Sequence, residues 1–401
     1  MVPFGPLMAM TKPRPVLVVI FLFLVALAAV PATPVLRAAA DTLPQRLTDA
    51  ELWKLSEDMS EPNGFFRSDN LLSNEIYYPY VMGQLQQLVG PSASVYMGVG
   101  PEQNFNYIAL LKPKMVFITD IRRGNMHTHL MYKALFELSA DRADFVGRLF
   151  TKKRPDGLTA KSTAEEIMTA YWNVTTGGQS VYDENLKAIQ DLLTKTHSLP
   201  LTREDVEGIA NIYYNFYWFG PLINYNSSSA QSGRGGGGNM ASYYDLMVAA
   251  DGSPVGKSYL ASEETFKVLK DLHQRNLFVP VVGNFGGPKA LRAVGKYVRE
   301  HGATVSAFYL SNVEQYLTQD GIWGNFCANV ATMPLDSHST FIRSSQNRGG
   351  GGGSGLVNRV VTTMAVRFAG TAFFLDVGDF AARRELTIAP DDAATIQCPK
   401  S

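Results

Sequence analysis

The spacing of apolar residues along the chain alternates between helical and extended patterns, and this alternation predicts the order of the elements. Residues 41–93 carry apolar side chains at helical spacing on both sides of a break at Pro62-Asn63-Gly64. From residue 94 the pattern becomes a short apolar run, a glycine turn, a helix-length segment and a second apolar run. A long helix is expected next, over about 125–150.

The second half of the chain returns to alternating strand and helix patterns after a segment of a different kind. Residues 156–260 predict mostly helices and loops, including an aromatic-rich helix at 209–220. The alternation then resumes in the following order: helix 263–276, strand 277–285, helix 288–302, strand 303–310, and further strands at 326–335 and 339–344. Apolar stretches near 360–366 and 372–377 indicate a weakly packed extension or an extra edge element.

Alternating strands and helices predict an α/β fold class with a mainly parallel, Rossmann-like sheet flanked by helices. We expect three parts. Residues 1–40 form a signal peptide or an N-terminal membrane anchor, and residues 41–345 form the α/β domain with a largely helical insertion at about 151–260. Residues 346–401 form a Gly-rich linker and a C-terminal extension.

The N-terminal segment predicts export. Lys12 and Arg14 precede an apolar run over residues 16–30, and small residues follow it. This is the layout of a secretory signal, and the run is shorter than the roughly 20 residues that span a bilayer comfortably. We expect a periplasmic or secreted protein, or one anchored to the membrane through residues 16–30. The pattern fits both a cleaved signal peptide and an uncleaved anchor.

Neither the net charge nor the cysteine content indicates a binding partner. Lys+Arg and Asp+Glu both number 36, so no basic excess attracts nucleic acid. The two cysteines, Cys327 and Cys398, either form one disulfide in an oxidising compartment or remain unpaired.

The strand–helix–strand unit carries the main candidate site. Gly98 and Gly100 lie where the first strand ends, and glycine there allows a sharp turn and the close approach of a ligand. Asp120 ends the second strand, 22 positions after Gly98, close to the roughly 20 expected for an acid that binds ribose hydroxyls. Pro101 and Glu102 follow the glycines and disfavour a pyrophosphate, which argues against NAD and FAD.

Three sequence blocks, "YMGVGPEQNFNYIALLKPKMVFITDIRRGN", "LMYKALFELSADRADFVGRLF" and "GNFGGPKALRAVGKYVREHGATVSAFYLSNVEQYL", carry a resemblance over roughly residues 45–345. They resemble an uncharacterised protein family with a Rossmann-like fold similar to S-adenosylmethionine-dependent methyltransferases. The resemblance implies S-adenosylmethionine as cofactor, bound by Gly98, Gly100 and Asp120, and the carboxylate of Glu102 would favour this cationic ligand. The chain departs from compact methyltransferases in the long stretch between Asp120 and the strand ending at Asn284.

Other residues are weighed against purely structural roles. Asn284, Tyr309 and Asn312 follow later strands and are candidate substrate-binding residues, although turn formation, helix capping and packing explain them equally simply. His127 and His129 could ligate zinc, but on a helix they point about 200° apart, so no metal is predicted. No catalytic residue is identified.

Two functions follow from these observations. The first is an S-adenosylmethionine-dependent, methyltransferase-like protein with an unknown substrate. The second is an exported, non-enzymatic binding or envelope protein that retains the fold without the cofactor, because S-adenosylmethionine is made in the cytosol and an exported protein seldom meets it. We expect a small nucleoside-like ligand, no nucleic acid, and membrane contact only through an uncleaved N-terminal segment.

Overall fold

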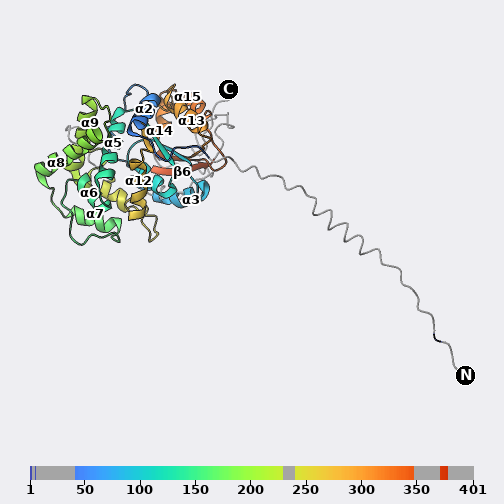
Figure 1. The fold of residues 1–401 in the computed structure, drawn as a ribbon, viewed down its shortest axis with the longest axis horizontal. Helices are drawn as coiled ribbons and strands as arrows, with labels where there is room; N and C mark the ends of the chain where they lie inside the picture. The colour runs from blue at the N-terminus through green and yellow to red at the C-terminus, as the bar shows by residue number, and fades with distance from the viewer. Residues whose placement is uncertain (2–4, 6–40, 229–239, 347–370, 378–401) are drawn as a thin grey trace. The chain divides into compact units, whose positions relative to one another are not determined.

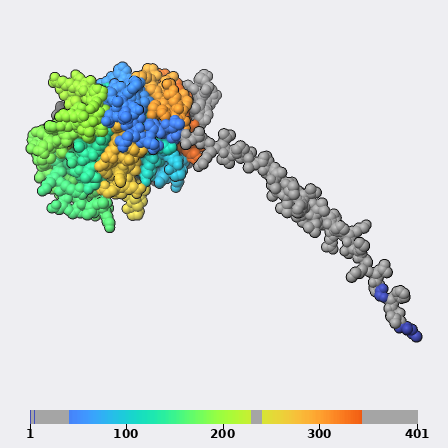
Figure 2. All heavy atoms as spheres, viewed as in Figure 1, coloured from blue at the N-terminus to red at the C-terminus, as the bar shows by residue number. Residues whose placement is uncertain are grey.

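The computed structural model describes residues 41–228, 240–346 and 371–377, together with Met1 and Gly5. The described residues from Asp41 onward belong to one compact unit. Figure 1 shows a central sheet between two layers of helices, with α6, α7, α8 and α9 together at one end of the unit, where Figure 2 shows the residues coloured green.

The sheet has six described strands in the order β3-β2-β1-β4-β5-β6. The five parallel strands are β1 (Val95–Gly98), β2 (Met115–Asp120), β3 (Phe278–Val282), β4 (Val305–Ser311) and β5 (Thr340–Gln346). β6 (Thr371–Val377) pairs antiparallel with β5 at the edge. The strand order reverses between β1 and β4, where Rossmann-like sheets bind their ligands. The predicted fold class is confirmed.

Helices cover both faces of the sheet, which explains why β1, β2 and β3 are buried along their whole length and mostly apolar. One layer contains α2 (Asp49–Met59), α13 (Ala290–Glu300), α14 (Val313–Gln319) and α15 (Trp323–Val330). The other contains α3 (Pro79–Val89), α4 (Gln103–Leu111), α5 (Arg123–Leu138) and α12 (Glu263–Gln274).

The described part of the stretch between α5 and α12 consists of helices joined by loops, with two isolated β-bridges. Its elements are α6 (Arg142–Leu149), α7 (Ala164–Trp172), α8 (Gly178–Asp191), the π-helical turn η1 (Leu192–Thr196), α9 (Arg203–Phe219), the 3-10 turn η2 (Gly220–Leu222) and α11 (Tyr243–Val248). α9 contains the predicted aromatic helix and packs against α5. The exact domain boundaries remain a prediction.

A buried polar network ties this helical stretch to the core. His197, just after η1, contacts Asp49 of α2 through Nδ1 and Glu137 of α5 through Nε2, both at 2.8 Å. Lys133, one turn before Glu137, donates to the same carboxylate at 2.6 Å. The hydrogen bond to Glu137 raises the pKa of His197 against the opposing effect of burial.

Two predicted elements differ in the structure. The helix expected over 125–150 is two helices, because Asp141 caps a new helix by accepting a hydrogen bond from the backbone N–H of Asp144. The segment 326–335, predicted as a strand, begins inside α15; its apolar residues are buried on one helical face and Asn329 donates to the carbonyls of Phe285 and Gly287. The predicted stretch 360–366 lies outside the described residues, whereas 372–377 falls in β6.

Two further observations concern the cysteines and the membrane. Cys327 is disulfide-bonded, and Cys398, the other cysteine of the chain, lies outside the described residues. Among the described residues no helix combines the length and apolar character that crossing a bilayer requires. The apolar run 16–30 lies outside them.

Candidate functional site

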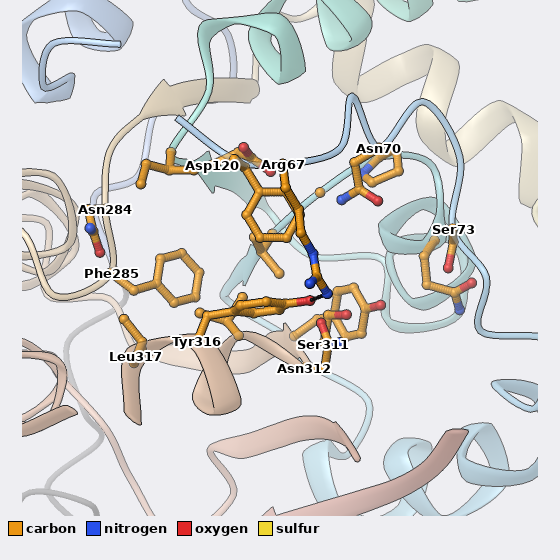
Figure 3. Close-up of a pocket in the computed structure, with 18 of the residues that line it drawn as sticks. Arg67, Asn70, Ser73, Asp120, Asn284, Phe285, Ser311, Asn312, Tyr316 and Leu317 are labelled. Atoms are coloured by element: carbon orange, nitrogen blue, oxygen red, sulfur yellow. Dashed lines mark hydrogen bonds between the residues drawn. The ribbon is translucent and has the colours of Figure 1, made fainter. Parts of the chain in front are cut away.

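A cavity of about 530 Å³ opens at the carboxyl ends of the parallel strands. Gly100 follows β1, Asp120 ends β2, Gly283 follows β3 and Ser311 ends β4, and all four line the cavity (Figure 3). Volumes of roughly 300–1,000 Å³ are typical of small-molecule sites, and this edge of a doubly wound sheet is where such sites form.

Gly100 and Asp120 meet at this edge. The Asp120 carboxylate is 5 % exposed and accepts a hydrogen bond from the backbone N–H of Arg122 at 2.9 Å. Burial raises its pKa, while the Arg122 guanidinium, 3.5 Å away, and the backbone amides of Arg122 and Gly100 lower it. A carboxylate offers about four acceptor positions, so the two amides leave capacity for a ligand.

Gly98 does not line the cavity, and the need for glycine at this position comes from packing inside the protein. A Cβ at residue 98 would lie 1.9 Å from Oδ1 of Asn104. The Asn104 amide N donates to the carbonyls of Val99, Gly100 and Pro101, so it holds the turn in shape. Gly98 therefore permits the turn, and it is Gly100, with φ of +74°, that faces the cavity.

Glu102 also lies off the cavity lining, in contrast to the ligand contact predicted for it. Its side chain is fully buried, and both carboxyl oxygens accept from the backbone N–H of Ser73, at 3.1 and 3.3 Å. Burial raises the pKa of Glu102 to about 8, so the side chain is neutral at pH 7. Glu102 holds the backbone of Ser73 against α4, and its own side chain does not reach the cavity.

The two histidines of α5 serve different partners. His129 Nε2 donates to the carbonyl of Gly100 at 2.9 Å, and burial lowers the His129 pKa to about 4, so this support is a neutral imidazole. His127 Nε2 contacts Asp205 Oδ1 at 2.7 Å. The pair does not converge on one point, and the described residues contain no group of His, Cys, Asp and Glu that could hold a metal ion.

The three predicted substrate-binding residues, Asn284, Tyr309 and Asn312, all line the cavity. Asn284 also has the turn role weighed for it, because its Oδ1 accepts from the backbone N–H of Gly286 at 2.9 Å. Beneath this turn the Glu61 carboxylate accepts from the backbone N–H groups of Asn284, Lys289 and Ala290. The N-terminus of α13 is thus already filled by a carboxylate of the chain.

The sequence interpretation missed a third wall of the cavity, the loop between α2 and α3. Arg67 of this loop donates to the hydroxyl of Tyr316 on α14 at 2.9 Å, and the Phe66 and Tyr316 rings meet edge to face at 5.0 Å (Figure 3). Asn70, Ser73 and the exposed Phe65 line the same wall. No motif marks these residues, and the break at Pro62-Asn63-Gly64 is the one sequence signal that a loop begins there.

Comparisons with known proteins give a family without an assigned activity. No curated protein matches the chain. Among solved structures, an rRNA methyltransferase, AviRa from Streptomyces viridochromogenes, aligns with 10% sequence identity and a TM-score of 0.29, over 81% of this chain and 93% of that one. A model of the family described as "Domain of unknown function (DUF7790)" matches residues 71–358, which is most of the sequence, and the chain therefore belongs to that family.

Proposed function

We propose that the protein binds S-adenosylmethionine in the cavity at the strand ends and acts as a methyltransferase-like protein on a substrate that is not yet known. One observation carries the proposal: Gly100 and Asp120 lie together on the lining of a cavity of about 530 Å³. A carboxylate with spare acceptor capacity after the second strand is suited to ribose hydroxyls, and the neighbouring glycine lets the ligand approach the backbone.

The electrostatics of the same edge favour a ligand without phosphates. Backbone N–H groups that would bind phosphate are directed at carboxylates of the chain, at Asp120 beside Gly100 and at Glu61 beneath α13. Pro101 contributes no N–H at all. A pyrophosphate would therefore meet negative charge where other Rossmann-like sites offer amides, whereas the sulfonium and ammonium of S-adenosylmethionine are compatible with that charge.

Catalysis in such a site consists mainly of alignment. Holding a methyl donor and an acceptor in one water-poor cavity supplies the orientation that a bimolecular reaction lacks. The polar side chains of Asn284 and Asn312, which also line the cavity, would orient the substrate that accepts the methyl group.

Binding of S-adenosylmethionine and S-adenosylhomocysteine to the purified full-length chain tests the proposal, by calorimetry and by the shift in unfolding temperature. A ligand at 100 times its dissociation constant stabilises the folded state by about 2.7 kcal/mol. Asp120→Asn is expected to weaken binding roughly tenfold or more through the lost charge-assisted hydrogen bonds. Glu102→Gln is the matched control, because that buried carboxyl lies off the cavity lining and its replacement is expected to leave binding unchanged.

The alternative of an exported binding protein without the cofactor is supported by a different observation. A disulfide at Cys327 is typical of an oxidising compartment, where S-adenosylmethionine is scarce. A folded chain that binds neither compound would favour this alternative and reject the methyl-transfer proposal.

A further inference from the structure

One wall of the cavity contains two hydroxyl groups that share a buried carboxylate. Tyr309 and Ser311, both on β4 and both on the cavity lining, donate hydrogen bonds to the two oxygens of Glu75, and the bond from Ser311 Oγ measures 2.7 Å. Glu75 is 2 % exposed and lies behind these hydroxyls. Its negative charge raises the pKa of Tyr309 further, after burial as the larger cause.

The direction of these hydrogen bonds determines what the wall can bind. Each hydroxyl directs its proton at Glu75, so the capacity that remains on its oxygen is that of an acceptor. A ligand group at this point must therefore donate a hydrogen bond, and a positively charged donor gains in addition from the carboxylate in a low-dielectric surrounding. An anion or a carbonyl oxygen would find neither a proton nor a favourable charge.

The backbone holds Ser311 at the cavity by a local irregularity. Ser311 has φ of +48°, and the pairing of β4 with β5 shifts register between Tyr309 and Ser311. A serine in the left-handed region is uncommon, and irregular strand ends of this kind redirect a side chain.

An independent feature of the same cavity is a buried amide with hydrogen-bonding capacity to spare. Gln103, 1 % exposed, lines the cavity, and neither its amide N nor its amide O has a hydrogen-bond partner, although the amide lies near enough to the Tyr107 hydroxyl to lower that pKa. The Tyr107 ring contacts the Tyr309 ring at 5.3 Å. Buried amides normally make hydrogen bonds, so the Gln103 amide can offer a donor and an acceptor to a ligand in the cavity.

We propose that Ser311 and Tyr309, backed by Glu75, bind the ammonium group of a ligand whose ribose is held at Asp120. β1 separates β2 from β4, so Asp120 and Ser311 are two strand spacings apart, about 10 Å. The ligand class is therefore a nucleoside with a cationic amine on a side arm long enough to span that separation. This inference rests on the proposed function and deepens it, because the amino-acid arm of S-adenosylmethionine ends in such an ammonium group.

A pair of ligands that differ in this arm tests the inference. S-Adenosylhomocysteine carries the ammonium, whereas 5′-methylthioadenosine has the same nucleoside and lacks the amino-acid group. Calorimetric titration of the full-length chain with both compounds is repeated for Ser311→Ala, Glu75→Gln and the control Glu102→Gln. We expect Ser311→Ala and Glu75→Gln to weaken S-adenosylhomocysteine roughly tenfold or more, to change 5′-methylthioadenosine less than about twofold, and Glu102→Gln to change neither.

The outcomes separate the two proposals. If the folded wild-type chain binds neither compound, the proposed function fails and this inference fails with it. If the chain binds S-adenosylhomocysteine and Ser311→Ala leaves that affinity unchanged, or weakens both ligands equally, the ammonium assignment alone is overturned. Ser311→Ala preserves Glu75 and the hydroxyl of Tyr309, so the assignment stays testable even if Glu75→Gln does not fold.

Discussion

Replacing Glu102 by glutamine provides a quantitative test of how this carboxyl is buried next to the cavity. Glutamine keeps the shape of the side chain and an oxygen that accepts from the backbone N–H of Ser73, but it cannot ionise. In the wild type, burial raises the pKa of Glu102 from 4.5 to about 8. The carboxyl therefore holds its proton in the folded state over a pH range in which the unfolded chain has lost it.

The sign and size of the effect follow from proton linkage. Between pH 4.5 and about 8 the folded state binds more protons at Glu102 than the unfolded state, so the free energy of unfolding falls as the pH rises. Each pKa unit corresponds to about 1.4 kcal/mol, which gives an upper bound of about 5 kcal/mol for the loss between pH 4.5 and pH 8. Glu102→Gln removes this loss, so the variant is expected to be more stable than the wild type above pH 8 and nearly equal to it at pH 4.5.

Urea unfolding at pH 5, 7 and 9 measures this difference, because titration of every other group is common to the two proteins. The exposed Glu207→Gln on α9 serves as a control, and its stability is expected to follow the wild type at all three pH values. Parallel stability profiles for Glu102→Gln and the wild type would refute the reasoning, since they would mean that Glu102 ionises in the folded state as it does in the unfolded chain.

Two further predictions concern the turn and the helical stretch. Gly98→Ala places a Cβ 1.9 Å from Asn104 Oδ1, and we expect it to reduce the free energy of unfolding, measured in urea, by about 3 kcal/mol. The control Gly83→Ala, in an open position on α3, is expected to raise the free energy of unfolding by up to about 1 kcal/mol. Equal effects at the two positions would contradict the structural role of Gly98. His197→Gln is expected to destabilise the protein more at pH 6 than at pH 9, because a raised histidine pKa contributes stability at low pH that is lost as the pH rises through the folded-state pKa. Thermal unfolding across that range measures the difference, and a difference that does not change with pH would reject the charged form of His197.

The elements that position the site were predictable because their signals are local. β1 and β2 begin with apolar runs and end at glycine and aspartate, and parallel strands place those ends at one edge. Asp120, Tyr309 and Asn312 therefore follow from the sequence as neighbours of one cavity. The division into α5 and α6 could not be predicted, because the apolar pattern continues across Asp141 and hides its role as a helix cap.

The roles of the buried carboxylates could not be predicted from the sequence. Glu102 follows a glycine turn in a position that suggests a ligand contact, and only the fold shows that the backbone of Ser73, 29 residues away, covers it. Glu61 caps α13 across more than 220 residues. Contacts between residues so far apart in the chain leave no spacing pattern in the sequence. The sequence around a loop carboxylate is the same whether the side chain faces solvent, a ligand or a helix end.

The arrangement of these carboxylates predicts that this edge of the sheet disfavours nucleotides that carry phosphates. Asp120 and Glu61 accept hydrogen bonds from backbone amides at the ends of β1 and β3, and Glu75 accepts hydrogen bonds from the hydroxyls at the end of β4. A further charge at Glu102 would add repulsion to Glu75, and burial removes it by keeping that carboxyl protonated at pH 7. The carboxylates that do line or back the cavity would favour hydrogen-bond donors and cations at the positions where phosphates bind in other Rossmann-like sheets. A chain that binds ATP or NAD more tightly than S-adenosylhomocysteine would contradict this electrostatic account directly.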